Sequence, residues 1–289
     1  MKVNIGDKLA RSIVNLIMIV VGLFCLLPVL NIFARSLSSL KAVAANEVLF
    51  WPVEFSLAGW EYIVERTIYL KALGNTVFIT FCGTLIAVVI TTLTAYSLSH
   101  RRLRGYRLFV GVYVGIMLFH AGILPNYFQV QAYGLLNSLW ALILPAVISS
   151  HYMFVLKKNM ESIPDSLEEA ALIDGASYSR ILFSVVFPVS KASIATITVF
   201  FSVHFWNKYF DALLYITKPS LKPITLFLYE LIHAVGMTEG RGDVELLSTI
   251  SQDIINASAV ILTIAPILVI YPFMQRYFVR GTLSGAIKG

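Results

Sequence analysis

The hydrophobic positions of this chain form long uncharged runs. No Lys, Arg, Asp or Glu occurs between Arg11 and Arg35, between Lys71 and Arg101, or between Arg107 and Lys157. A helix needs about 20 apolar residues to cross a bilayer, so the first two runs predict one span each and the third predicts two. With two later runs, the pattern predicts an all-α polytopic membrane protein whose six transmembrane helices lie at about 12–34, 75–98, 108–124, 135–156, 193–216 and 254–275.

Composition agrees with this interpretation. Of the 289 residues, 58% are hydrophobic and 13% are charged, whereas a soluble domain has about 25% charged residues. The net charge of +6 is typical of Lys and Arg gathered on the cytoplasmic side of a membrane, and we do not take it as a sign of nucleic-acid binding. Lipid is therefore the expected surrounding. The two cysteines, Cys25 and Cys82, lie inside apolar runs and have no disulfide or metal spacing.

The placement of Lys and Arg predicts the orientation. Basic residues occur in the N-terminal tail, between Arg101 and Arg107, in the loop 157–191 and after the last span. The positive-inside rule therefore places both termini and the loop 157–191 in the cytoplasm. The loops 35–71 and 217–253 then lie outside, and residues 1–289 form a single transmembrane domain.

A polar stretch from Pro164 to Pro188 interrupts the apolar pattern. Ser166 and Glu169 have the spacing of a capping box, which predicts a helix that begins near Leu167. Asp174-Gly175 predicts a left-handed stop, and a second short helix is expected from Ser177 to just before Pro188. A helix of two turns is not stable alone in water, so it must dock on its own chain or on a partner.

This stretch resembles the EAA loop of ABC-importer permeases. Glu169-Ala170-Ala171 is followed at the family spacing by Gly175 and Pro188, although Val185 and Phe187 replace the usual Ile and Leu. The resemblance implies a type I importer permease whose loop is a coupling helix docked on a cytoplasmic ATPase. An ordinary amphipathic connector is the alternative. The candidate ATPase-coupling residues are Glu168, Glu169, Ala170, Ala171, Asp174, Gly175 and Pro188.

The C-terminus from Pro272 to Gly289 is similar to the tail of carbohydrate-importer permeases related to the inner-membrane pair of the maltose importer. That resemblance implies that the tail inserts between two ATPases and that the protein lies in the bacterial cytoplasmic membrane. Glycines permit a close approach of backbones. The candidate contact residues are Gly281, Gly285, Lys288 and Gly289.

Residues 134–141, Gly-Leu-Leu-Asn-Ser-Leu-Trp-Ala, resemble the branch of this family that handles uronate-containing and other complex oligosaccharides. The implied substrate is an oligosaccharide, with an acidic sugar of alginate or aldouronate type among the candidates. The substrate would cross the membrane by alternating access.

The fifth predicted span is rich in groups that suit a sugar. Aromatic rings cover the apolar face of a sugar ring, and amide, ammonium and carboxylate groups bind its hydroxyl edge. A structural Lys208–Asp211 pair within an interfacial aromatic belt is the alternative. The candidate substrate-path residues are His204, Trp206, Asn207, Lys208, Tyr209, Asp211 and, from an earlier segment, Tyr127.

No P-loop, zinc-protease or nucleophile-elbow motif occurs in the sequence. We therefore expect a non-catalytic subunit with no cofactor of its own, and ATP and Mg²⁺ bound by partner chains. The resemblance implies four kinds of partner: a second, different permease, two ATPase subunits, an extracytoplasmic solute-binding protein and the oligosaccharide. The alternative function is an ion-gradient-driven secondary transporter or channel, which would carry midplane charges along several spans.

Overall fold

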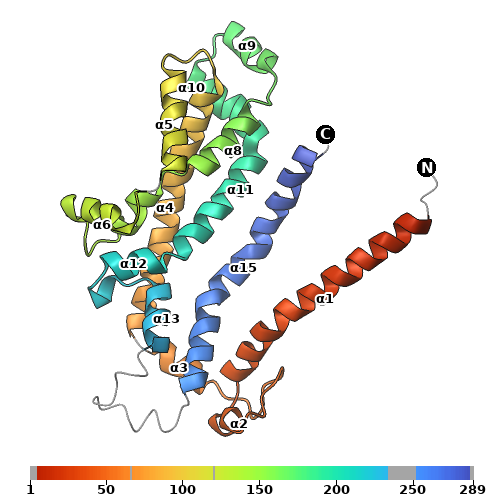
Figure 1. Cartoon of the computed structure of the whole chain (residues 1–289), viewed down its shortest axis with the longest axis vertical. Helices are drawn as coiled ribbons and strands as arrows, with labels where there is room; N and C mark the ends of the chain where they lie inside the picture. Colours follow the sequence, from red (N-terminus) through yellow and green to blue (C-terminus); the bar gives the residue numbers. More distant parts are fainter. Residues whose placement is uncertain (1–4, 66, 120, 234–251, 287–289) are drawn as a thin grey trace. The chain divides into compact units, whose positions relative to one another are not determined.

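The computed structural model describes residues 5–65, 67–119, 121–233 and 252–286. Within these ranges the regular elements are helices, which confirms the all-α prediction (Figure 1). The chain groups into two compact units. Unit 1 combines Met1–Tyr69 with Leu228–Pro266, and unit 2 combines Leu70–Phe227 with Ile267–Gly289.

Unit 1 is built around the first long helix. Its elements are α1 (Ile5–Ser36), α2 (Leu40–Ala44), α3 (Ala58–Val64) and the first half of α15 (Gln252–Ala286). Every side chain of α1 from Arg11 to Leu30 is exposed, so this apolar surface needs lipid or protein to cover it. The small core of unit 1 consists of Ala34, Ala42, Val43, Val48 and Ile254.

The loop after α2 folds back on the end of α1 through polar contacts. The Asn31 amide donates a hydrogen bond to the carbonyl of Leu49 at 2.6 Å. Ser38 Oγ accepts one from the Val53 amide and donates one to the Ala34 carbonyl at 2.7 Å. These bonds satisfy loop backbone groups that would otherwise be unpaired near the apolar helix.

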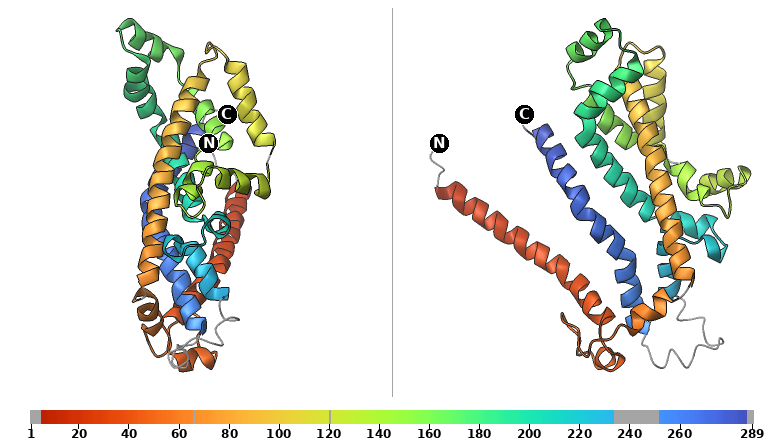
Figure 2. Two further views of the ribbon diagram at one scale, coloured as in Figure 1. Left: turned by 90° about the vertical axis from the view of Figure 1, so that its left-hand side faces the viewer. Right: turned by 180° about the vertical axis from the view of Figure 1, so that it is seen from behind.

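Unit 2 consists of the second half of α15 and a set of longer and shorter helices. They are α4 (Thr67–Ser99), α5 (Tyr106–Leu118), α6 (Ile123–Ala132), α7 (Trp140–Ile143), η1 (Leu144–Ala146), α8 (Ser150–Met160), α9 (Asp165–Ile173), α10 (Tyr178–Ile181), η2 (Leu182–Val186), α11 (Phe187–Trp206), α12 (Tyr209–Tyr215), η3 (Pro219–Leu221) and the start of α13 (Ile224–His233). Figure 2 shows α4 and α11 running alongside each other.

One buried cluster joins α4, α8, α10 and α11 near the end of unit 2 that carries α9 (Figure 1). Large side chains interdigitate here, and burial of their apolar surface is the main force that holds these helices together. We call this set the bundle-end cluster. Its members are Ala95, Tyr96, Leu98, Met153, Leu156, Met160, Ile163, Ile181, Leu182, Val186, Ile194 and Ile197.

Among the described residues, four helices are long and apolar enough to cross a membrane each, and the number rises to six if two bent pairs each form one span. The four are 11–36, 67–99, 178–206 and 252–269. The bent pairs are α5 with α6, and α7–η1 with α8. The expected class of polytopic helical membrane protein is therefore confirmed, and helix breaks divide two of the predicted spans.

The sequence predicts that the second helix of the polar stretch ends before Pro188, and this prediction is wrong. That helix continues from α10 through the π-helical turn η2 into α11, whose first turn contains Pro188. Proline lacks the N–H of a regular turn and clashes with the carbonyl four residues before it. A π turn relieves this clash by widening the helix, and it also buries Leu182 and Val186 in the bundle-end cluster.

The fifth predicted span is also interrupted. α11 ends at Trp206, Asn207 caps it, and α12 begins at Tyr209. Asn207 and Asp211 therefore do not lie on one continuous helix. The side-chain amide of Asn207 donates a hydrogen bond to the Val203 carbonyl at 2.9 Å, in addition to the bond from the Asn207 backbone N–H to the same oxygen.

The contact between α4 and α11 depends on Gly83. A Cβ atom at Gly83 would lie 2.7 Å from the ring of Phe205, which is 1% exposed. We expect Gly83→Ala to cost about 1–3 kcal/mol of stability because a buried ring has to move. The measurement is the thermal unfolding midpoint of the purified protein in detergent.

Gly74→Ala is the matched control, because Gly74 lies in the same helix with nothing within 4 Å of its Cβ position. Its midpoint should equal or slightly exceed that of the unmodified protein. Equal midpoints for the two variants would contradict the close packing of α4 on α11.

Candidate functional site

The nine-residue helix α9 begins earlier than the sequence predicts. It spans Asp165–Ile173, its N-cap is Pro164, and no side chain caps it. The expected capping box at Ser166 is therefore wrong. Pro164 has an extended backbone (φ −60°, ψ 129°) that leads directly into the helix, and Asp165 and Glu168 place negative charge near the exposed N–H groups of the first turn.

The end of α9 lies where the sequence predicts it. Gly175 adopts a left-handed conformation with φ +79°. Its amide donates to the Leu172 carbonyl at 3.0 Å, and the Ala176 amide donates to the Ala171 carbonyl at 2.9 Å. This pair of bonds is a Schellman motif, which requires a left-handed residue at its centre. The following helix α10 is capped by Ser177, also as predicted.

The two long faces of α9 have different surroundings. Ala171, together with Ala176 beyond the helix end, packs against the bundle-end cluster, and Glu168 is half-buried. Glu169 and Ile173, four residues apart, lie on another face and are exposed, Ile173 to 86%. The bundle thus holds α9 by one side, while the other side presents an acidic and a large apolar side chain to the surroundings.

Three of the remaining predicted coupling residues lie on α9 or at its end, and the fourth lies in another helix. Ala170, Asp174 and Gly175 are exposed. Pro188 is 15 residues or more from α9 along the chain and lies in the first turn of α11. Pro188 therefore shapes the π turn that leads into α11 and does not belong to the exposed face of α9.

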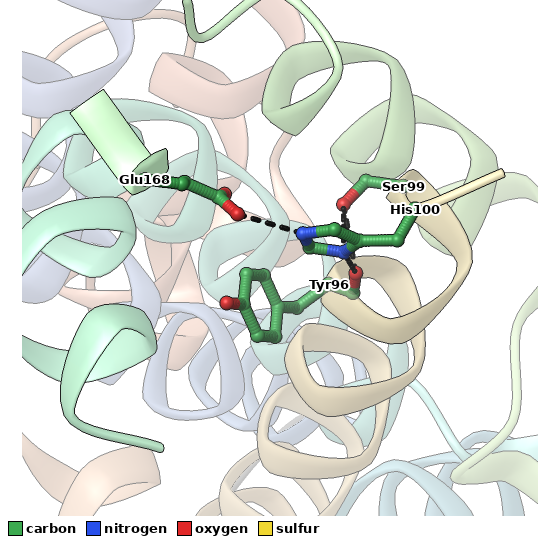
Figure 3. A network of polar contacts seen from close by, with 4 residues as sticks. All are labelled: Tyr96, Ser99, His100 and Glu168. Atoms are coloured by element: carbon green, nitrogen blue, oxygen red, sulfur yellow. Dashed lines mark hydrogen bonds and ion pairs between the residues drawn. The ribbon is translucent and has the colours of Figure 1, made fainter. Parts of the chain in front are cut away.

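A contact that the sequence analysis missed ties α9 to α4. His100 Nε2 lies 2.7 Å from Glu168 Oε2, and His100 Nδ1 lies 2.9 Å from the carbonyl oxygen of Tyr96 (Figure 3). A carboxylate and a carbonyl oxygen only accept hydrogen bonds. Both contacts are hydrogen bonds at the same time only when both ring nitrogens carry protons, that is, when the imidazole of His100 is positively charged.

Opposing effects act on the pKa of the His100 imidazole. Its partial burial by itself would lower the pKa of the imidazole, but the hydrogen bonds to Glu168 and to the Tyr96 carbonyl, with the charges of Glu168 and Asp165, outweigh it and raise the pKa of His100. Only the distance along the chain hid this pair from sequence reasoning, since 68 residues separate its members.

Most of the predicted substrate-path residues gather around the break between α11 and α12, at a distance from α9 within unit 2 (Figure 1). Lys208 is 7% exposed and pairs with Asp211 at 2.5 Å, so the predicted ion pair exists. Trp206 is buried, whereas His204 and Asn207 are exposed. The break therefore combines a buried lysine, paired with a half-buried aspartate, with exposed hydrogen-bonding groups.

Tyr127 of α6 approaches the same region. Its ring centroid lies 6.3 Å from that of Tyr215 in α12. Tyr209 is half-buried at the first position of α12. The structure thus brings the earlier segment to α12, although the role of these side chains as a substrate path stays a prediction.

The predicted tail is described in part. Gly281 and Gly285 lie within the helical bounds of α15. Lys288 and Gly289 lie outside the described residues. Among the residues described, no group of three or more His, Cys, Asp or Glu side chains could hold a metal ion.

Comparison with known proteins identifies the class of this fold. Residues 87–284 match the family described as "Binding-protein-dependent transport system inner membrane component". This range includes α9, His100 and the bundle-end cluster. The chain belongs to this family. This permease is thus a transport component, as the EAA-like loop predicts, and the predicted type I importer-permease fold is confirmed.

Relatives of this permease match nearly its whole length. It is 34% identical over 98% of its chain and 99% of the relative to the polygalacturonan/rhamnogalacturonan transport system permease protein YtcP of Bacillus subtilis. It is 33% identical to protein LplC of the same organism, over 93% and 91% of the two chains.

A solved structure matches the permease closely. A chain of a bacterial ABC transporter involved in the import of the acidic polysaccharide alginate superposes with a TM-score of 0.88 at 26% identity. The match covers 96% of this chain and 99% of that one. The two proteins therefore share the same overall fold over nearly their whole lengths.

The left-handed residue at the end of α9 can be tested by substitution. We expect Gly175→Val to loosen the turn between α9 and α10, because a residue with a Cβ pays about 1–2 kcal/mol for this conformation. Trypsin should then cut faster after the exposed Arg180 in α10 of the detergent-solubilised protein. Gly175→Asn, which tolerates a left-handed backbone, is the control; equal cleavage rates for Val and Asn would contradict the motif.

Proposed function

We propose that this permease is one membrane-spanning subunit of an ATP-driven importer for acidic oligosaccharides. In this proposal it pairs with a second, different permease, and two ATPase subunits drive the pair through inward-facing and outward-facing states. An extracytoplasmic solute-binding protein delivers the sugar. ATP and Mg²⁺ are bound by the ATPase subunits, and this chain contributes no catalytic group.

The observation that carries the proposal is the one-sided attachment of α9. A helix of nine residues is too short to be stable alone, and here Ala171 and Glu168 fasten one face to the bundle. The exposed face offers Glu169 and Ile173, the mixture of a charge and an apolar anchor that protein interfaces use. An ATPase groove lined by basic and apolar groups would fit this face.

Charge placement supports a cytoplasmic position for α9. His100 contacts Glu168 and is followed directly by Arg101, Arg102 and Arg104, all of them exposed. The basic turn and α9 are thus at the same end of unit 2. By the positive-inside rule this end faces the cytoplasm of a bacterial cell, together with both termini. The tail residues from Gly281 to Gly289 would then reach the ATPases.

The names of the similar proteins support an acidic substrate. One relative is a polygalacturonan/rhamnogalacturonan permease, and the superposed structure belongs to an importer of the acidic polysaccharide alginate. An acidic oligosaccharide carries a carboxylate on its sugar units, and a carboxylate needs cationic or hydrogen-bonding groups along its path. Lys208, which is buried and paired with Asp211, is a cation beside the exposed Asn207 and His204.

The docking of α9 is tested by Glu169→Lys. We expect the variant to assemble in the membrane but to lose binding-protein-stimulated ATP hydrolysis by about tenfold, because a lysine replaces the acid that faces the ATPase. The measurement is ATPase activity of the whole complex in proteoliposomes, with and without loaded binding protein.

Glu47→Lys is the control, because it makes the same charge reversal at an exposed position in the loop after α2. Full stimulation in the Glu169→Lys complex would refute the coupling role of α9. Equal losses in both variants would show that the effect is a general one of charge.

The part of Lys208 in transport is tested by removing both charges of its ion pair. Lys208→Met with Asp211→Leu leaves no unpaired buried charge, so the protein should fold. If the ammonium binds the substrate carboxylate, the substrate concentration for half-maximal transport should rise about tenfold for an acidic oligosaccharide. Unchanged transport by the double variant would show that the pair is structural only.

A further inference from the structure

Besides the packing of Ala171 against the bundle-end cluster, the helix α9 has two kinds of connection to the rest of unit 2. The chain itself joins it to α8 on one side and to α10 on the other. α4 is not its neighbour in sequence, yet His100, the residue after the end of α4, contacts Glu168 in the middle of α9 at 2.7 Å. Through this contact a movement of α9 reaches a third helix directly.

Both side chains of the His100–Glu168 contact are held in place by further contacts. The orientation of the His100 ring is fixed by α4. Its Nδ1 donates to the Tyr96 carbonyl one turn earlier, and its ring packs edge-on against the Tyr96 ring with 4.9 Å between the centroids. Glu168 is fixed on the same face of α9 as Ala171, which packs against the bundle-end cluster. A charge-assisted hydrogen bond is shorter and stronger than one between neutral groups.

We propose that His100 is a positioning residue whose charged contact with Glu168 transmits the movement of α9 to α4. This inference rests on the proposed docking of α9 on an ATPase subunit. When the ATPases close and displace α9, the link carries α4 with it, together with the helix α11 that packs on Gly83. Without the link, α9 would act on α4 only through its two chain neighbours and through the packing of Ala171 against the bundle-end cluster.

The charge of His100 makes this link dependent on pH. The groups that face the imidazole are Glu168 and Asp165 of α9, Tyr96 and Ser99 of α4, and Tyr178 of α10, whose ring lies 6.4 Å away. The pKa of His100 is raised above its ordinary value of 6.5. The link is therefore complete below that value and is lost as the pH rises through the raised pKa.

The test uses the whole transporter in proteoliposomes with its binding protein, and it measures molecules of sugar transported per ATP hydrolysed. We expect His100→Gln and Glu168→Gln each to lower this ratio about three- to tenfold at a pH near 6, where the imidazole is charged. The double variant should be no worse than either single variant, because both remove the same contact.

The pH profile separates this role from a purely structural one. With the cytoplasmic side set between about pH 6 and 8.5, the ratio for the unmodified complex should fall as the pH rises. It should be low and flat for His100→Gln. A His100→Gln complex with the ratio and the pH profile of the unmodified complex would overturn the proposal, and so would additive losses in the double variant.

Two further variants make the outcome decisive. Glu161→Gln breaks the ion pair of Glu161 with Lys157, which lies within one helical turn at 2.6 Å, and should keep the pH profile. Glu169→Lys tests docking itself. If Glu169→Lys uncouples transport while His100→Gln does not, only the link fails; if Glu169→Lys has no effect, the proposed function fails.

Discussion

The arrangement of unit 2 depends on how a helix too short to hold itself is fastened to the bundle. The Schellman turn at Gly175 returns the chain so that Ala171 and Ala176 meet the bundle-end cluster together. Burial of this small apolar surface and the contact between Glu168 and His100 replace the stability that nine residues cannot supply. Because one face is used for attachment, the exposed side chains of the other face are presented in a fixed direction.

The breaks in the bundle follow from a second constraint, the need to satisfy backbone and charged groups among apolar neighbours. Pro188 has no backbone N–H to donate, and the π turn before it widens the helix so that the chain continues through the proline. Between α11 and α12, the backbone and side-chain amides of Asn207 both donate to the Val203 carbonyl, and Lys208 is neutralised by Asp211. Irregular backbone in a membrane protein is tolerated where protein or a water-filled cavity surrounds it. The break between α11 and α12 therefore places polar groups among apolar neighbours and satisfies them within the chain.

Local rules predicted much of this molecule. The uncharged runs identified a helical membrane protein, and Asp174-Gly175 and Ser177 marked the turn after α9 correctly, because these signals act within a few residues. The N-cap of α9 at Pro164 was missed, because the spacing of Ser166 and Glu169 suggested a capping box. Proline has no backbone N–H, so a helix with Pro164 as its N-cap does not need the bond that a capping box supplies to that position. The contact of His100 with Glu168 could not be read from the sequence: a single histidine at the end of an apolar run has no local partner, and its meeting with α9 arises only when α4 and α8 pack.

The central claim is that the exposed face of α9 contacts an ATPase on the cytoplasmic side. Benzoylphenylalanine placed at Ile173 in the intact transporter tests it most directly, with the same photo-cross-linker at Trp51, 82% exposed in the loop after α2, as the control. The account predicts a cross-link from position 173 to an ATPase subunit and none from position 51. Capture of the ATPase from position 51, or none from position 173, would contradict it.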